Sequence, residues 1–118
     1  MSQKKRGYQF EHDVASIFSN AGYYVILSRN SMGTFDFLAV KDGITFGVQC
    51  KFNNHIRPNE ITAMKMAFKT FGIIPLYAYK NEKSPLILKD LLNDKIINID
   101  ELPELPKKYV DTFQSSFH

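Results

Sequence analysis

Two apolar runs joined by Asp42-Gly43 constrain the fold of this chain more than any other feature. Asp-Gly between runs rich in Val, Ile, Phe and Thr is the strongest short-range signal for a two-residue β-hairpin. The stretch 33–52 is therefore predicted to form two antiparallel strands. With Asp42 and Gly43 as the loop residues, Lys41 faces Ile44 and the register of all later pairs follows.

This register predicts a polar and an apolar face on the hairpin. Asp36 is expected to lie opposite Gln49, and Lys51 shares their face because side chains alternate along a strand. The other face carries Phe46, Val48, Cys50 and Phe52. A carboxylate, an amide, an ammonium group and the backbone carbonyl of Cys50 suit binding of a divalent cation and a phosphate. An ordinary solvated hairpin face has the same composition, and the spacing alone does not separate these two interpretations.

A helix is predicted before the hairpin, from about residue 7 to residue 21, with Gly22 as its C-cap. Its apolar stripe consists of Phe10, Val14, Ile17, Phe18 and Ala21. Glu11 lies at one edge of this stripe and Asp13 at the other. Helix geometry therefore offers two acids that can reach the sheet and does not choose between them.

The remaining pattern predicts further strands and a second helix. Residues 23–27 form a continuous apolar run, which is typical of a central strand. A helix is expected to begin at Pro58 or at the residue after it, and to end at Gly72. Its buried stripe consists of Ile61, Met64, Ala67, Phe68 and Phe71. Residues 73–79 and 86–88 are predicted strands.

The C-terminal third carries a weaker pattern. Residues 95–99 are compatible with a short edge strand, Pro103 and Pro106 are expected to break any helix, and residues 107–113 are compatible with a closing helix. The element order predicts a single-domain α/β fold with a central mixed five-stranded sheet flanked by helices. The domain is expected to span residues 1–118, with its core at about 4–89, and the fold of 90–118 is left open.

Charge and cysteine content limit the function classes. The net charge is +3, and the basic side chains concentrate in the first two-thirds of the chain. The candidates for contact with a polyanion such as DNA are Lys4, Lys5, Arg6, Arg29, Ser31, His55 and Arg57. A solvated mixed surface, and a plain connecting loop at 28–34, explain the same residues. The single Cys50 forms no internal disulfide, and no signal peptide or membrane span is evident, so a cytoplasmic location (the host cytoplasm for a viral source) is expected.

Three short motifs, taken together, resemble a known superfamily. They are Arg6-Gly7-Tyr8-Gln9-Phe10-Glu11, Gly33-Thr34-Phe35-Asp36 and Gln49-Cys50-Lys51. Their order and spacing resemble the PD-(D/E)XK nucleases, and within these the archaeal Holliday junction resolvases, including members from archaeal viruses. The similarity covers roughly residues 4–80. It implies a restriction-endonuclease-like fold.

The resemblance also implies roles for individual residues. Glu11 and Asp36 would be the metal-site acids, Gln49 the third site position and Lys51 the catalytic lysine. Mg²⁺, with Mn²⁺ as an alternative, would be the cofactor of a homodimer that nicks opposing strands of a four-way DNA junction. Ser31 lies in the loop that often carries a functional serine in this family.

The chain departs from the family pattern at Gln49, where the family usually has Glu, and at Ser28-Arg29, where the basic residue is displaced by one position. Loss of one negative charge at position 49 weakens metal binding. Two alternatives therefore stay open: a nuclease of the same fold that acts on flaps, single strands or nicked duplex, and a junction-binding protein with weakened catalysis.

Overall fold

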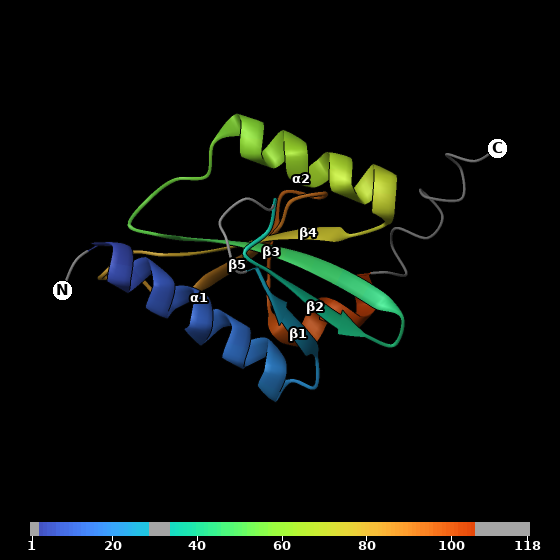
Figure 1. The fold of residues 1–118 in the computed structure, drawn as a ribbon, viewed down its shortest axis with the longest axis horizontal. Coiled ribbons are helices and arrows are strands. Elements are labelled where there is room, and N and C mark those ends of the chain that lie inside the picture. The colour runs from blue at the N-terminus through green and yellow to red at the C-terminus, as the bar shows by residue number, and fades with distance from the viewer. Residues whose placement is uncertain (1–2, 29–33, 106–118) are drawn as a thin grey trace.

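The computed structural model describes residues 3–28 and 34–105, with side chains from residue 6 onward. Within these residues a six-stranded sheet runs in the order β1-β2-β3-β4-β5-β6. One helix packs on each face of the sheet (Figure 1). Only the β3–β4 pair is parallel, and the other four pairs in this sheet are antiparallel. This confirms the predicted single-domain α/β fold with a mixed sheet.

The elements follow the chain in this order: α1 (Gln3–Asn20), β1 (Tyr24–Leu27), β2 (Phe37–Lys41), β3 (Ile44–Phe52), α2 (Pro58–Phe71), β4 (Ile74–Lys80), β5 (Ile87–Asp90), β6 (Lys95–Ile97) and a 3₁₀ helix η1 (Ile99–Glu104). Helix α2 begins at Pro58 as predicted, and Gly72 ends it in the left-handed conformation with φ 73°. No helix in the described ranges is long and apolar enough to cross a membrane.

The hairpin forms with the predicted loop. Asp42 and Gly43 have φ angles of 53° and 78°, as a two-residue turn with two left-handed positions requires. Lys41 pairs with Ile44, and the same register continues to the pair Phe37–Val48. The predicted register is therefore confirmed over the whole of β2.

The pairing changes at Asp36, and here the prediction was wrong. The ladder stops at Phe37, and the N–H of Asp36 donates to the carbonyl oxygen of Val48 at 2.8 Å instead of pairing with Gln49. Phe35 lies in the apolar cluster under α2, whereas Phe37 lies in the cluster under α1. Two residues that regular alternation would place on one face thus lie on opposite faces. The strand is irregular at Asp36.

Gly47 permits this irregularity. A Cβ atom built on Gly47 would lie 2.6 Å from two ring carbons of Phe35, closer than any real carbon contact. Phe35 therefore packs directly on the backbone of β3, and only glycine leaves the necessary space. The non-local contact between these two residues holds the chain before β2 in its irregular path.

Two apolar layers enclose the sheet. Phe10, Val14 and Phe18 of α1 pack on one face, and Met64 and Ala67 of α2 pack on the other. Three residues of the predicted stripes are instead exposed: Ala21, which lies just after the end of α1, Ile17 by 40% and Phe71 by 74%. Helix α1 buries Ala15 on its sheet-facing side.

Strand β1 is an edge strand, which corrects the prediction of a central one. Among the described strands it pairs only with β2, and Tyr24, Ile26 and Leu27 are 71%, 46% and 47% exposed. Helix α1 covers one face of β1, with Val25 packed against the core. The apolar run therefore reflects an exposed apolar surface rather than burial on both faces.

The segment after β5 adds a sixth strand to the five that were predicted. β6 pairs with β5 through Leu88–Ile97 and Asp90–Lys95. A 3₁₀ helix follows and includes Pro103, which was expected to break any helix. Leu102 and Leu105 are buried in the core, so this segment contributes to it. The expected helix at 107–113 lies outside the described residues.

Replacing Gly47 by alanine tests the packing of Phe35. We expect Gly47→Ala to destabilise the protein by about 1–3 kcal/mol, because the added methyl group overlaps the Phe35 ring. Urea denaturation measures this change. Gly7→Ala is the matched control, since Gly7 lies in α1 with no atom near the added carbon, and it is expected to leave stability unchanged or raise it. Equal stability of Gly47→Ala and the unchanged protein would contradict the close packing of the Phe35 ring on the backbone of Gly47.

Candidate functional site

Two carboxylates meet where the β2–β3 pairing ends. Glu11 is half-buried on α1, and its side chain shares a hydrogen bond with the side chain of Asp36. The neighbouring residue Phe10 packs against Phe52, with ring centroids 5.9 Å apart, and this contact places the N-terminal part of α1 over the end of β3. Asp13 is exposed and accepts a hydrogen bond from Gln9 at 2.8 Å. The structure thus selects Glu11 from the two candidate acids.

A backbone amide fixes Asp36. The N–H of Cys50 donates to Oδ2 of Asp36 at 2.7 Å. Cys50 lies beyond the last β2–β3 pair, so strand β2 offers it no backbone partner on that side. The Asp36 carboxylate accepts the hydrogen bond that a backbone carbonyl of β2 would accept in a longer strand pair. A hydrogen bond from a backbone N–H to a charged oxygen is stronger than one between neutral groups.

The acid pair holds a proton near neutral pH. Burial, the hydrogen bond with Asp36 and the negative charge of Asp36 together raise the pKa of Glu11 from 4.5 to about 7. Between these two values the folded protein binds more protons than the unfolded chain does. Stability therefore falls as the pH rises from about 4.5 to about 7. A divalent cation held by these two carboxylates would take the place of this proton and would offset the repulsion between their charges.

The thiol of Cys50 does not belong to the polar site. It is buried, and burial first, then the charges of Asp36 and Glu11, raises its pKa well above the ordinary value. The sulfur therefore stays protonated at neutral pH. The contribution of Cys50 to the site is its backbone N–H, which is bound to Asp36.

Lys51 is held from the α2 side of the sheet. Its Nζ lies 2.9 Å from Oε2 of Glu60, and both side chains are largely buried. Glu60 also accepts the N–H of Arg57 through Oε1 at 3.1 Å at the start of α2. Burial raises the pKa of Glu60, but the hydrogen bonds and charges of Lys51 and Arg57 outweigh it, and the pKa lies below its ordinary value. Glu60 thus anchors Lys51 to α2.

Gln49 lies on the same face as Lys51. It is half-buried and pairs in register with Tyr77 of β4. Among the described residues, its side chain has no hydrogen-bonding partner, and neither Gln49 nor Lys51 bonds to Asp36. The site therefore surrounds the end of the β2–β3 pairing: Glu11 approaches Asp36 from α1, and Lys51 is tethered to α2.

The donor set fits a hard cation that retains water. In the described part of the chain, no three His, Cys, Asp or Glu side chains are grouped closely enough to hold a metal. Two carboxylates do meet, and the Gln49 amide oxygen and the Cys50 carbonyl lie on the adjacent strand. Mg²⁺ is typically bound by one or two carboxylates, with water and phosphate completing the octahedron. The chemistry of these donors fits this ion.

The predicted DNA-contacting residues have diverse surroundings. Arg6 forms an ion pair with Glu82, which ties α1 to the turn before β5. His55 and Arg57 are exposed in the loop that leads into α2. The side chains of Lys4 and Lys5, and the residues Arg29 and Ser31, lie outside the described residues.

Sequence reasoning missed several residues that shape this site. Glu60 is the third residue of α2, and a Glu at that position after a helix start is a known capping signal. The alternating Tyr77 and Tyr79 place two rings on one face of β4 next to Gln49 and Lys51. Gly47 and Phe35 carried no local signal, because their contact joins two separate segments.

A mixed sheet between two helices, with an acid pair where the β2–β3 pairing ends and a lysine on β3, defines a restriction-endonuclease-like domain. The family model Mrr_cat, described as restriction endonuclease, matches residues 2–82, which is more than half of the chain. The chain therefore belongs to this family, as the resemblance to PD-(D/E)XK nucleases implied.

A solved structure shares the fold. The structure of Hjc from Archaeoglobus fulgidus, a Holliday junction resolvase from an archaeal hyperthermophile, matches with a TM-score of 0.63 and 16% identity. The match covers 84% of this chain and 88% of that one. No curated protein matches the chain. At this identity the structural match establishes the fold.

Carboxyl NMR titration tests the acid pair. Glu11 is expected to titrate near pH 7, and Asp36→Asn lowers its pKa toward, but not down to, 4.5, because burial remains. Asp13→Asn, which removes an acid from the same helix, is expected to leave the Glu11 titration unchanged. An ordinary Glu11 pKa in the unchanged protein would show that the two carboxyl groups do not meet.

Proposed function

We propose that this protein is a metal-dependent DNA endonuclease that resolves four-way (Holliday) junctions by paired nicks. The observation that carries the proposal is the Glu11–Asp36 pair, fixed by the Cys50 amide beside the strand that bears Lys51. Membership of the restriction endonuclease family supports nuclease chemistry, and the shared fold with a junction resolvase supports this substrate.

Mg²⁺, or Mn²⁺ in its place, would be held by carboxylate oxygens of Glu11 and Asp36, with Gln49 Oε1 and the Cys50 carbonyl as further ligands. When bound, such an ion neutralises charge at the phosphate and lowers the pKa of a bound water. The Cys50 N–H keeps the Asp36 carboxylate in one orientation, so the site is preorganised. Glu11 would have to be deprotonated to act as a ligand of such a cation.

Lys51 would stabilise the charge that develops on the phosphate. Its ammonium group is a compact cation with three donors, and Glu60 holds it at 2.9 Å. A lysine restrained in this way needs little reorganisation to donate to a phosphate oxygen. Glu60 acts here through Lys51, by limiting the positions its Nζ can take.

Paired nicks in opposing strands require two active sites related by symmetry, and therefore a homodimer. An exposed apolar surface suits this assembly. Ile26 and Leu27 of β1, together with Phe71 of α2, line an apolar hollow of about 300 Å³. Tyr24 and Met66 are exposed on the same two elements by 71% and 53%. Exposed apolar area of this kind marks protein–protein contact sites.

Labelled four-way junctions test the proposed reaction. In Mg²⁺ the protein is expected to place symmetrical nicks in opposing strands, and Asp36→Ala is expected to reduce the rate by more than about 100-fold, because a ligand and its hydrogen bond are lost. Asp13→Asn is the matched control and is expected to cut normally. Equal cutting of junction, flap and linear duplex would favour a nuclease of the same fold that acts on other DNA structures. Nicks that survive Asp36→Ala would show that the Glu11–Asp36 pair is not the active site.

Restoring a carboxylate at position 49 tests metal binding. Gln49→Glu is expected to bind Mg²⁺ more tightly, because it adds a negative ligand on β3 next to Cys50, whose amide binds Asp36, and the melting temperature then rises more steeply with Mg²⁺ concentration. Gln9→Glu, on the exposed surface of α1, provides the control for added charge. Junction binding without cleavage in Mg²⁺ or Mn²⁺, and no gain from Gln49→Glu, would identify a non-catalytic junction-binding protein.

A further inference from the structure

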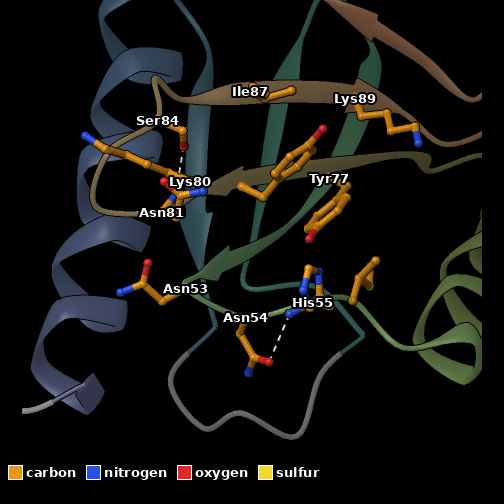
Figure 2. A pocket seen from close by; sticks show the side chains of 11 residues that line it. Asn53, Asn54, His55, Tyr77, Lys80, Asn81, Ser84, Ile87 and Lys89 are labelled. Carbon is orange, nitrogen blue, oxygen red and sulfur yellow. Dashed lines mark hydrogen bonds between the residues drawn. The ribbon is translucent and has the colours of Figure 1, made fainter.

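A second hollow opens on the α2 side of the sheet, next to the candidate site. Its volume is about 570 Å³, and strands β4 and β5 and the two loops at 53–56 and 80–84 line it. Figure 2 shows Tyr77 at its centre, with His55 below and Ile87 and Lys89 above, while Lys80, Asn81 and Ser84 lie to one side. A volume of this size is typical of pockets that hold one small ligand group.

An aromatic platform forms part of its wall. The rings of Tyr77 and Tyr79 stack with centroids 4.6 Å apart and an interplanar angle of 26°. Tyr77 is buried and packs in the apolar cluster under α2, so its ring is held in place by its neighbours. Tyr79 is the more exposed of the two. The platform therefore presents a ring on a rigid support.

The polar lining favours an anionic ligand. Lys80, Lys89 and His55 contribute to the wall, and the lining residues include no acid. Asn54 and Asn81 accept backbone N–H groups through their side-chain oxygens. No described residue accepts a hydrogen bond from their NH₂ groups, which remain available as donors. Lys89 pairs with the exposed Asp94 at 2.7 Å, and an exposed pair of this kind is readily exchanged for a ligand phosphate.

The hollow adjoins the candidate site through the parallel strands. Gln49 pairs in register with Tyr77, and Lys51 pairs with Tyr79. Register partners on neighbouring strands project from the same face of a sheet. Lys51 and the tyrosine platform are therefore one strand apart on the α2 face. A nucleic-acid strand with one phosphate at Lys51 reaches the platform with an adjacent nucleotide.

We propose that this hollow binds an unpaired nucleotide of the DNA substrate. The base stacks on Tyr79, and the flanking phosphates meet Lys80, Lys89 and His55. Stacking on an aromatic ring requires an exposed base face, so the site selects DNA with unpaired nucleotides beside the position that is cut. The inference rests on the proposed nuclease function and specifies the substrate structure that this nuclease prefers.

Binding measurements in EDTA test the hollow without catalysis. Fluorescence anisotropy compares a labelled 12-nucleotide single strand with a blunt duplex of the same sequence. Tyr79→Ala is expected to weaken single-strand binding by about five- to 150-fold and to leave duplex binding unchanged, because only unpaired bases stack on the ring. Tyr79→Phe keeps the ring and is expected to retain the affinity.

Two further variants complete the test. Tyr8→Ala removes a 64% exposed tyrosine on α1 and is expected to bind both DNAs normally. Lys89→Gln is expected to weaken the single-strand complex and reduce its salt dependence, because one phosphate contact is lost. Thermal melting of each variant checks that the fold is retained.

The outcomes distinguish this inference from the function on which it rests. The unchanged protein could cleave DNA in a metal-dependent way while Tyr79→Ala and Lys89→Gln leave single-strand binding unaffected. This result would overturn the proposed nucleotide site in the hollow and would leave the nuclease proposal standing. Parallel losses for single strand and duplex would also overturn it. Absence of both DNA binding and cleavage in the unchanged protein would overturn the nuclease proposal itself.

Discussion

The hydrogen bond from the Cys50 amide to the Asp36 carboxylate is the interaction on which the rest of the site depends. The bond is available because β2 ends at Phe37 and leaves the Cys50 N–H without a strand partner on that side. An unpaired amide in this half-buried position would be costly, and the carboxylate satisfies it. The same bond fixes a negative charge beside Glu11, which then retains its proton near neutral pH. Backbone pairing and the protonation of the site are thus set by one contact.

The two helices have different roles around this contact. Helix α1 supplies Glu11 and covers the core with Phe10, Val14 and Phe18. Helix α2 supplies no acid to the pair, but its first turn presents Glu60 to Lys51. The acid pair and the lysine are therefore positioned by helices on opposite faces of one sheet. Strand β3 connects them, because the amide of Cys50 binds Asp36 and the next residue is Lys51. A substitution in α1 or in α2 that shifts β3 would therefore move both parts of the site.

Local patterns predicted the features that local chemistry determines. Asp42-Gly43 predicted the hairpin and its register, and Pro58 and Gly72 predicted the bounds of α2. The irregularity at Asp36 was not predictable, because it depends on Phe35 packing over Gly47, a contact between the segment before β2 and strand β3. The position of β1 at the sheet edge was missed because a continuous apolar run does not distinguish burial from an exposed apolar surface. The meeting of Glu11 and Asp36 was foreseen as one of two choices, whereas the Lys51–Glu60 pair was not foreseen.

The order of the strands has a consequence for how the protein reaches its native state. Each strand of the described sheet pairs with its neighbour in the chain, and a single connection, through α2, joins two parallel strands. Most pairings therefore close short loops, which favours rapid folding. The β3–β4 pairing requires a longer closure across α2, and it is this step that brings Tyr77 and Tyr79 beside Gln49 and Lys51. An intermediate with only the antiparallel hairpin formed would already contain Asp36 and the Cys50 amide, but it would lack the aromatic wall next to them.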